Sequence, residues 1–382
     1  MRILHVIPFL WSGAGNVLTR LCIAQAAGND VAIVTSGRSK GFTDWPEYRK
    51  QLKAANVEHF QIDFFHREPG VFWPGVEKFA KLTRSWKPDL IHCHAGVPAC
   101  AAALSGSRFI AQIHSWGIGR PEWMNTMDLG GFRQAARVLC GSIAYQRILV
   151  NGGVDPARIR YIPWGLDLGQ IETRALARDY MPGRTVRREH VGAGFSPRSF
   201  NVGFLGRMEP RKNQLELARA FHKFHKRHPE SKLEFIGPVA DNDYRDEICA
   251  FIEKSRLSDA VKLRGRVANP YPKVKTWNLF TSLSSDEGQG IAILEAMALG
   301  VPVLGRRVAG VEDYLRDGRT GIAVGSGSPE EVSERMEWAL HHKKDIAAIA
   351  SRARLMVETD YNWTSTVQKM NRLYETVTGT NL

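Results

Sequence analysis

The feature that most constrains the fold is the alternation of short apolar segments with amphipathic segments along the 382-residue chain. The apolar segments have the length of strands, and the segments between them repeat apolar residues at helical spacing. Strands that are apolar along their whole length and separated by helices are typical of a parallel sheet covered on both faces. In the first half the expected strands are 2–9, 30–36, 89–95, 108–114, 137–142 and 159–165.

A polar stretch rich in glycine, proline and arginine interrupts this alternation, after which it restarts. The expected strands are then 200–206, 232–238, 261–267, 279–284, 301–306 and 321–324, with helices at 212–227, 243–256, 290–299 and 329–341. We therefore predict an α/β protein with two tandem Rossmann-like, doubly wound domains. The predicted parts are a first domain at 1–168, a linker at 169–198, a second domain at 199–363, and a last helix in 364–382 that could cross back to the first domain.

Composition excludes some classes of protein and leaves others open. Hydrophobic residues make up 43% and charged residues 24% of the chain, as in globular proteins, and no apolar run has the length of a membrane span. The N-terminal apolar run is short and ends at a glycine turn, so we expect a first strand rather than a signal peptide, and a cytoplasmic protein. Five scattered cysteines indicate reduced, buried thiols rather than a disulfide framework.

The net charge of +13 favours an anionic partner, and the excess is larger in the first half of the chain. Nucleotides, phosphorylated substrates, an acidic membrane surface and nucleic acid all satisfy this condition. A basic stripe every three residues at 78–87 adds a reason to consider a membrane surface, although a solvated helix face explains the same pattern.

Ligands of open α/β sheets bind outside the carboxyl ends of the strands, so residues that follow strands are the candidates. The stretch "SSDEGQGIAILEAMALGVPV" at 284–303 places Glu287 before a glycine-rich turn and Glu295 about one turn into the next helix. Gly288 and Gly290 let the backbone approach a ligand, and the helix start suits a phosphate. Carboxylates at these two positions can accept hydrogen bonds from sugar and ribose hydroxyls.

Two cations follow the strand at 200–206. Arg207 lies directly after it, and Lys212 is expected to open the next helix, so together they could bracket a diphosphate.

Three further patterns resemble sites of other chemistry. Gly13 and Gly15 form an expected turn after the first strand, but residue 18 is leucine, so the dinucleotide-binding fingerprint is incomplete and a dehydrogenase is disfavoured. The histidines at 92, 94 and 114 have a spacing that resembles a zinc site, yet a histidine at 114 that binds a substrate hydroxyl is the better hypothesis. The "DND" at 241–243 is interpreted as a helix cap. We predict no metal.

With these residues in view, the chain resembles the retaining glycosyltransferases of family 4, which have the GT-B fold of two Rossmann-like domains facing a cleft. The resemblance covers almost the whole chain. Its most specific part is the pair Glu287 and Glu295, with seven residues between them, within "SDEGQGIAILEAMALGVPVLGRRVAGVEDYLRDGRTG". The segments "GRMEPRKN" and "YIPWGLD" also match family elements. Two positions depart from the family pattern, Gln289 in place of an aromatic residue and Trp164 in place of asparagine.

The resemblance implies transfer of a sugar from a nucleoside-diphosphate sugar, UDP rather than GDP, to a hydroxyl acceptor in envelope glycan, glycolipid or small-glycoside synthesis. It implies no cofactor, no metal and no nucleic acid. The implied catalytic residues are Arg207, Lys212, Glu287 and His114. The implied nucleotide-sugar residues are Glu295, Gly288, Gln289, Gly290, Ile291 and Arg266, and the implied diphosphate and acceptor loop is Gly13 to Gly15. A peripheral contact with an anionic membrane remains open.

Two alternatives stand beside this hypothesis. A sugar-nucleotide epimerase or a phosphorylase on the same fold would act on a similar donor without transferring the sugar to a separate acceptor. A non-catalytic binder of anionic polymers would use the positive charge, and it predicts a basic patch with aromatic stacking and a steep dependence of binding on salt.

Overall fold

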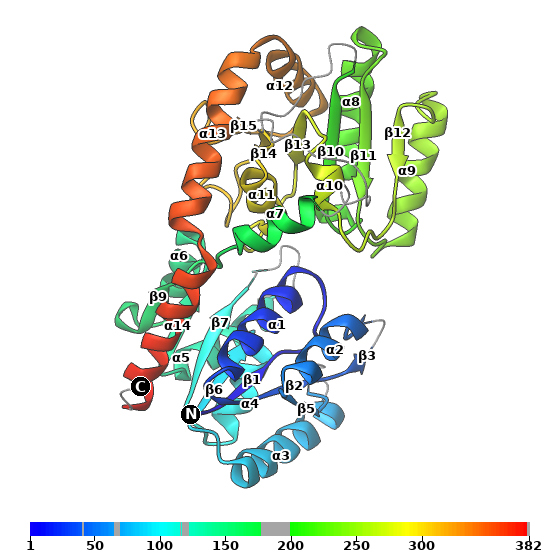
Figure 1. Ribbon diagram of the computed structural model, residues 1–382. Coiled ribbons are helices and arrows are strands. Elements are labelled where there is room, and N and C mark those ends of the chain that lie inside the picture. The colour runs from blue at the N-terminus through cyan, green and yellow to red at the C-terminus, as the bar shows by residue number, and fades with distance from the viewer. Residues whose placement is uncertain (40–41, 65–68, 115, 117–121, 177–198, 380–382) are drawn as a thin grey trace, which may run out of the picture. The chain divides into compact units, whose positions relative to one another are not determined.

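The computed structural model describes residues 1–39, 42–64, 69–114, 116, 122–176 and 199–379. The chain divides into two compact units, which Figure 1 shows as a ribbon. Unit 1 comprises Met1–Trp164 and Thr364–Leu382, and unit 2 comprises Gly165–Trp363. The start of the expected linker forms helix α7 (Leu168–Leu176) in unit 2, and residues 177–198 of that linker lie outside the described residues.

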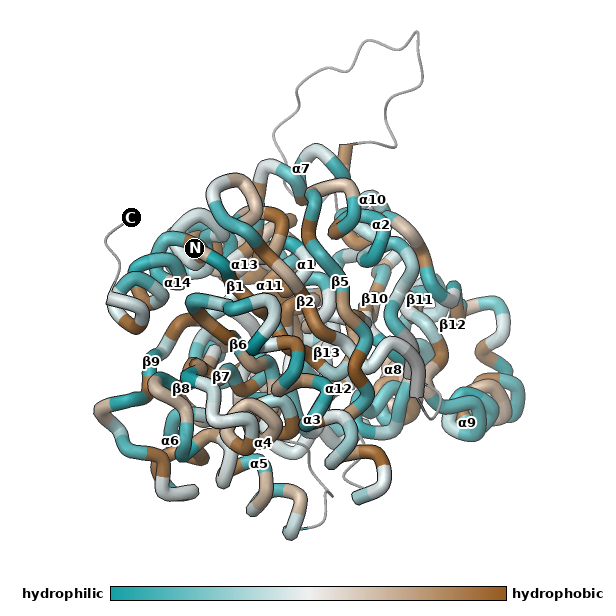
Figure 2. The backbone as a smooth tube through the Cα atoms, turned by 90° about the horizontal axis from the view of Figure 1, so that it is seen from below, coloured by the Kyte–Doolittle hydropathy of each residue, from teal (hydrophilic) through white to brown (hydrophobic). Residues whose placement is uncertain are grey.

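Unit 1 contains a sheet of seven parallel strands in the order β5-β2-β1-β6-β7-β8-β9. The strands are β1 (Arg2–Val6), β2 (Asp30–Thr35), β5 (Glu58–Gln61), β6 (Leu90–His94), β7 (Phe109–Ile113), β8 (Arg137–Cys140) and β9 (Ile159–Tyr161). A separate antiparallel pair is formed by β3 (Arg38–Ser39) and β4 (Phe42–Thr43). The apolar run of β2 is visible in Figure 2. Because such runs are buried between the helices, the central strands are held side by side with their carboxyl ends at one edge of the sheet.

Helices follow the strands of unit 1 as the alternation predicts. They are α1 (Ser12–Ala26), α2 (Pro46–Ala54), α3 (Pro69–Trp86), α4 (Gly96–Leu104), α5 (Glu122–Gln134), α6 (Ile143–Asn151), the short 3₁₀ helix η1 (Pro156–Arg158) and the C-terminal α14 (Trp363–Thr378). The C-terminal helix contacts the sheet of this unit, because Tyr374 is buried and its hydroxyl lies 2.6 Å from Nδ1 of His92 on β6.

Unit 2 contains six parallel strands in the order β12-β11-β10-β13-β14-β15. The strands are β10 (Asn201–Leu205), β11 (Lys232–Ile236), β12 (Val261–Leu263), β13 (Leu279–Ser282), β14 (Val303–Arg306) and β15 (Ile322–Val324). The other elements are the 3₁₀ helix η2 (Pro210–Lys212) and the helices α8 (Gln214–Arg227), α9 (Asn242–Lys254), α10 (Tyr271–Val274), α11 (Ile291–Ala298), α12 (Pro329–His341) and α13 (Lys343–Asp360).

Two hydrophobic clusters cover the two faces of this second sheet. Leu279 of β13 packs in the cluster that holds α8, α9 and α12, whereas its neighbour Phe280 packs in the cluster that holds α7, α10 and α11. The alternation along one strand shows that both faces are buried. Gly203 on β10 is required here because a Cβ at that position would lie 1.9 Å from the ring of Trp277.

Several predicted details differ in the structure. Strand β5 and helix α13 were not predicted. Cys249, expected to be buried, is exposed on α9, while the other four cysteines are buried and all five are free. Asp241 caps α9 as predicted, because its carboxylate accepts from the backbone N–H of Tyr244 at 3.0 Å.

Candidate functional site

The candidate site of unit 2 lies where the direction of chain winding reverses. Strand β10 has β11 on one side and β13 on the other, so the segments after β10 and β13 leave the same edge of the sheet side by side. Such a reversal point is where open α/β sheets bind ligands. Arg207 and Lys212 follow β10, and residues 284–290 follow β13.

Hydrogen bonds between these two segments fix them against each other. The Asn213 amide donates to the carbonyl of Leu283 at 2.8 Å, and the backbone N–H of Ser285 donates to the carbonyl of Arg211 at 2.8 Å. Asn213 has a left-handed backbone (φ 54°), a conformation that asparagine tolerates better than most residues. It ends η2 and lets α8 begin one residue later. Lys212 therefore lies at the end of a 3₁₀ turn rather than opening the helix, which corrects the sequence prediction.

Lys212 and Glu287 form an ion pair across the two segments. The Lys212 Nζ atom lies 2.6 Å from Glu287 Oε1, and the two side chains are only 11% and 13% exposed. The Ser284 hydroxyl donates to the same oxygen at 2.7 Å. Burial alone would raise the pKa of the Glu287 carboxyl, but the Lys212 ammonium and the Ser284 hydroxyl outweigh it and hold the pKa below its usual value. Glu287 is consequently an anion at neutral pH.

Two guanidinium groups share one carboxylate beside this pair. Arg207 Nη2 lies 3.1 Å and Arg211 Nε 2.8 Å from Glu209 Oε1. Burial lowers the pKa of Arg207, yet an arginine starts so high that it stays charged. Arg211 Nη1 also lies 4.0 Å from Asp286 Oδ2, so the three cations of segment 207–212 are balanced by three carboxylates in the protein.

The glycine-rich turn after Glu287 is shaped by close backbone contacts. Gly290 has φ 65° and is the N-cap of α11, and the Tyr314 hydroxyl donates to the carbonyl of Gln289 at 2.8 Å. A Cβ at Gly290 would lie 2.6 Å from that hydroxyl oxygen, and one at Gly310 would lie 2.3 Å from the carbonyl oxygen of Glu287. The α11 N-terminus, beginning at Ile291, therefore carries no side-chain cap.

Glu295 lies one turn into α11, as predicted. The Tyr271 hydroxyl donates to Glu295 Oε1 at 2.8 Å, and the guanidinium of Arg174 lies over the Tyr271 ring at 4.6 Å from its centroid. The contact fixes one carboxylate oxygen of Glu295 in place. Arg266 is exposed on the segment after β12. Gln289 is buried, with 5% of its surface exposed.

In unit 1 the structure places His114 directly after β7, at the end of a row of hydrogen-bonded rings. His114 Nε2 lies 3.0 Å from His94 Nδ1, and His94 Nε2 lies 3.0 Å from His5 Nδ1. His5 Nε2 in turn lies 2.8 Å from Gln25 Oε1 on α1. Burial lowers the pKa of His5 and His114 to about 4 and that of His94 well below its usual value, so the rings are neutral at neutral pH.

The row assigns a proton to one nitrogen of each ring. The Gln25 carbonyl oxygen can only accept, so His5 carries its proton on Nε2 and accepts at Nδ1. The same logic puts a proton on Nε2 of His94 and then on Nε2 of His114. The Nδ1 atom of His114 is therefore a hydrogen-bond acceptor. Trp164, noted above as a departure from the family pattern, stacks on His114 with ring centroids 5.7 Å apart and planes 15° apart.

The histidine spacing that resembled a zinc site is explained instead by the row of hydrogen-bonded rings. His5, His92 and His94 have nitrogens close enough to share an ion, but both ring nitrogens of His5 and of His94 already take part in the row. His92 Nδ1 is occupied by the Tyr374 hydroxyl.

Gly13 and Gly15 do not form the expected turn. Both lie in the first turn of α1, which begins at Ser12, and the Gly15 N–H bonds to the Trp11 carbonyl at 3.0 Å. Glycine at position 15 permits a close approach, because a Cβ there would lie 2.8 Å from the carbonyl carbon of Leu10.

Sequence reasoning missed the residues that support the site. Ser284 was within the quoted motif, but its hydrogen bond to Glu287 carries no sequence signal. The sequence analysis gave no role to Tyr271, which begins α10, or to Tyr314 and Glu209, although the last two lie within quoted motifs. His5 stands alone in an apolar strand and gave no indication of its partners.

Known families match nearly the whole chain. The family described as Glycosyltransferase Family 4 matches residues 11–170, and the family described as Glycosyl transferases group 1 matches residues 187–356. The chain therefore belongs to the family 4 glycosyltransferases, and its two Rossmann-like units are those of the GT-B fold.

Individual relatives agree with this assignment. The D-inositol 3-phosphate glycosyltransferase of Paenarthrobacter aurescens is 31% identical over 209 residues, covering 53% of this chain and 48% of that protein. The chain thus spans about half the length of the first relatives it matches.

Solved structures share the fold along the full chain. The crystal structure of Anabaena Alr3699/HepE in complex with UDP and glucose has a TM-score of 0.79 at 20% identity, covering 98% of this chain and 100% of that one. Sucrose-phosphate synthase from Thermosynechococcus elongatus has a TM-score of 0.80 at 18% identity, covering 99% of each chain.

Within the described ranges, the helices are all too short or too polar to cross a bilayer.

Proposed function

We propose that this chain transfers a sugar from a nucleoside-diphosphate sugar to a hydroxyl acceptor, with retention at the anomeric carbon and without a metal. The observation that carries the proposal is the arrangement after β10 and β13. The buried Lys212–Glu287 pair, the neighbouring Arg207 and the uncapped start of α11 lie at the reversal point of one sheet. Cations and an open helix N-terminus suit a diphosphate, and a buried carboxylate beside them suits the hydroxyls of its sugar.

Each residue then has a role in binding the donor. Arg207 and Lys212 stabilise the negative charge that develops on the departing diphosphate, and the backbone N–H groups of Gly290 and Ile291 add to it. Glu295 accepts hydrogen bonds from the ribose hydroxyls. The remaining nucleotide-sugar residues are Gly288, Gln289 and Arg266, with Arg266 on the side of the base.

In the reaction the bond between the anomeric carbon and the β-phosphate oxygen breaks, and a bond to the acceptor oxygen forms on the same face of the sugar. The acceptor proton passes to the departing phosphate oxygen, and the nucleoside diphosphate leaves. The protein residues hold charge and hydroxyls in place rather than forming a covalent intermediate. The work expected of them is electrostatic stabilisation of the leaving group.

The histidine row supports a role for His114 in binding a hydroxyl. Its Nδ1 accepts and its Nε2 is committed to His94, so His114 would receive a hydrogen bond from a donor-sugar hydroxyl. We also propose that the α1 N-terminus at Gly13 and Gly15 serves the diphosphate and the acceptor.

The partners follow from charge and from the relatives. UDP is favoured because the Anabaena protein is described with UDP and glucose. A phosphorylated polyol is one acceptor that fits the +13 charge, since relatives are named D-inositol 3-phosphate glycosyltransferases. Glycans, glycolipids and small glycosides of the cell envelope are the wider class. We place the protein in the cytoplasm, where the exposed basic residues of α3 could also contact an anionic membrane from its inner face. These residues are Lys78, Lys81 and Arg84.

A thermal-shift screen of UDP-, GDP- and ADP-sugars tests the donor, because a bound ligand raises the melting temperature by mass action. We expect UDP-sugars to give the largest shift, and Lys212→Ala to abolish it. Lys223→Ala is the matched control, since that lysine lies on α8 in an exposed pair with Glu330. Equal shifts in Lys212→Ala and the native chain would contradict the proposed site.

Product analysis with the labelled donor identifies the reaction. Appearance of the label in a glycoside, together with free UDP, supports transfer. A labelled epimer of the donor would support the epimerase, and a sugar phosphate formed only with added phosphate would support the phosphorylase.

A further inference from the structure

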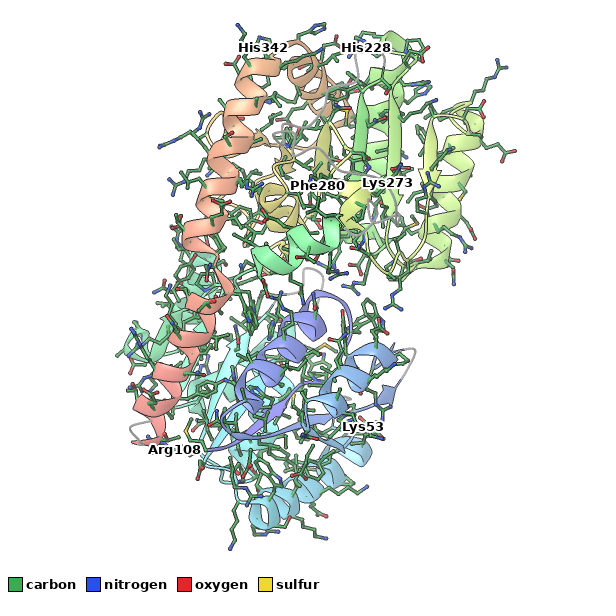
Figure 3. All side chains as sticks on the ribbon, viewed as in Figure 1. Lys53, Arg108, His228, Lys273, Phe280 and His342 are labelled. Carbon is green, nitrogen blue, oxygen red and sulfur yellow. The ribbon has the colours of Figure 1, made fainter. Side chains whose placement is uncertain are left out.

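A second cluster of reactive side chains lies at the far end of α8. Helix α8 carries Lys212 just before its start and His228 just after its end, so roughly 20 Å of helix separates the two ends. Figure 3 shows His228 at the same end of unit 2 as His342, which follows α12. Glu337 and His341 of α12 lie one helical turn apart and complete the cluster with His228.

Both imidazoles are directed at one carboxylate oxygen. His228 Nε2 lies 2.7 Å and His341 Nε2 3.0 Å from Glu337 Oε1. The three ligand atoms all lie within 4.8 Å of one another. A tetrahedral zinc ion with bonds of about 2.0–2.1 Å holds its ligand atoms about 3.3 Å apart. The carboxylate and the two nitrogens therefore need shifts of about 1 Å, and the 61% exposed side chain of His341 has room to make them.

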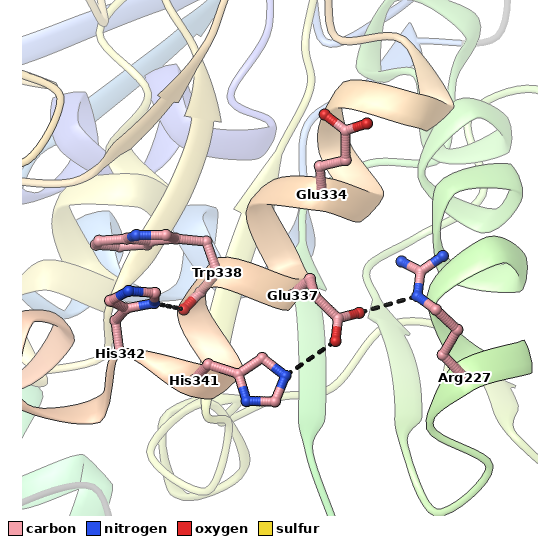
Figure 4. Close-up of a pocket in the computed structure, with 6 residues that line it drawn as sticks. All are labelled: Arg227, Glu334, Glu337, Trp338, His341 and His342. Carbon is pink, nitrogen blue, oxygen red and sulfur yellow. Dashed lines mark hydrogen bonds and ion pairs between the residues drawn. The ribbon is translucent and has the colours of Figure 1, made fainter.

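Two helix ends favour a cation at this point. Helices α8 and α12 both end here, and the C-terminus of a helix carries a partial negative charge. Burial is the largest single influence and opposes ionisation of Glu337, but hydrogen bonds from His228, Arg227 and His341 together outweigh it and lower the pKa to about 2. Arg227 Nε donates to the other carboxylate oxygen at 3.0 Å, which orients Glu337 from behind, as in Figure 4.

The cluster also leaves room for the remaining coordination position. Arg227, Glu337 and His341 line an open pocket of about 420 Å³, together with Glu334, Trp338 and His342. Water can therefore reach an ion held by three protein ligands. His342 is not a candidate ligand at Nδ1, because that nitrogen lies 2.8 Å from the Trp338 carbonyl and its ring stacks on Trp338.

The donor set distinguishes this cluster from the buried histidines of unit 1. Here two imidazoles and one carboxylate converge, which is a set that zinc prefers, and one open position remains. In unit 1 the nitrogens of His5 and His94 are already joined in a row without a carboxylate.

We propose that His228, Glu337 and His341 form a zinc site that ties the end of α8 to the end of α12. The site is independent of the proposed glycosyl transfer. In the metal-free structure each Nε2 carries a proton that it donates to Glu337. On zinc binding the proton of each Nε2 moves to Nδ1, or to water where Nδ1 is already protonated, and the freed Nε2 lone pair binds the ion.

Titration of the full tag-free chain with zinc chloride, followed by calorimetry, tests the proposal. We expect one zinc ion to bind per chain. At a free zinc concentration 100 times the dissociation constant, the melting temperature should rise by roughly 5 °C. His341→Ala and Glu337→Gln should each weaken binding at least tenfold. Glu334 and His342 line the same pocket but are not proposed ligands. The control variants Glu334→Gln and His342→Ala should therefore bind zinc as the native chain does.

Spectroscopy of the cobalt-substituted protein gives a second measurement. Co²⁺ in a four-coordinate site absorbs far more strongly in the visible range than six-coordinate Co²⁺, so we expect an intense band that disappears in His228→Ala. Unchanged zinc affinity in all three ligand variants would overturn the proposal, because the ion would then bind elsewhere. Absence of zinc binding by a folded native chain would overturn it as well.

Discussion

Replacing Lys212 by methionine separates two consequences of the buried ion pair. The substitution removes the ammonium that lies 2.6 Å from Glu287 Oε1 and leaves a carboxylate that is only 13% exposed. Leaving one partner of a buried pair uncompensated costs about 3–5 kcal/mol. We therefore expect Lys212→Met to lower the free energy of unfolding at pH 7 by about that amount. We also expect turnover to fall by roughly 10²–10³, because the diphosphate loses a preorganised cation.

The dependence of this loss on pH follows from the pKa of Glu287. In the native chain that pKa is below the usual glutamate value of 4.5. The pair therefore stabilises the folded state fully above the unfolded-state pKa, and this contribution is lost as the pH falls through the lower folded-state value. Without Lys212, burial is opposed only by Ser284 and Arg211, so we expect the folded-state pKa of Glu287 to rise. The destabilisation of Lys212→Met should consequently be largest at neutral pH. It should shrink as the pH falls towards the pKa of a free glutamate carboxyl.

A double variant distinguishes stability from catalysis. Lys212→Met with Glu287→Gln replaces the charged carboxylate by a neutral amide, so we expect most of the lost stability to return while turnover stays low. Urea unfolding between pH 5 and 8 measures the stability. Release of UDP from the donor identified by thermal shift measures the turnover. Lys223→Met controls for loss of an exposed lysine on α8. The reasoning is refuted if the double variant is no more stable than Lys212→Met, or if Lys212→Met turns over at the native rate.

Three further predictions address other parts of the chain. Gly290→Ala should lower the free energy of unfolding by about 1–3 kcal/mol in urea and weaken UDP binding, whereas Gly300→Ala, also at positive φ but with open space around it, should leave UDP binding unchanged. In ¹⁵N–¹H spectra of the imidazole rings, we expect His114 to carry its proton on Nε2, and His94→Leu to give a mixture of tautomers; a mixture in the native chain would contradict the row of rings. Reversing the exposed charges of α3 should abolish co-sedimentation with vesicles of anionic lipid, and no co-sedimentation of the native chain would remove that proposal. The residues to reverse are Lys78, Lys81 and Arg84.

Sequence patterns predicted the elements that apolar periodicity marks. Strands such as β2 are apolar along their length, and the structure buries them as predicted. Strand β5 was missed because its residues, Glu58–Gln61, form an edge of the sheet and only partly bury their side chains. An edge strand has one hydrogen-bonding neighbour and needs little apolar surface, so periodicity gives it no signal.

The candidate site was predictable in its residue types but not in its contacts. Glu287 and Glu295 were found from a motif, because both lie within nine residues of one turn. Their partners could not be found, since Lys212 is 75 positions from Glu287 and Tyr271 is 24 positions from Glu295. Contacts of this length depend on the order of strands in the sheet, and that order is a property of the fold rather than of local pattern. The prediction that Lys212 opens a helix failed for a local reason, because Asn213 takes a left-handed conformation that ends the preceding turn.

The buried pair itself argues for function rather than stability. A well-packed apolar pair would stabilise the fold at least as well as two desolvated charges, so a buried ion pair is weak evidence of a stabilising role. Lys212 and Glu287 nevertheless lie on the two segments that the Asn213 and Ser285 hydrogen bonds lock together. Each holds the other charged and in place while no donor is bound. A donor brings a diphosphate for the cation and hydroxyls for the carboxylate, so it would satisfy both groups at once. Lys212 would then bind the diphosphate and Glu287 the sugar of the same ligand.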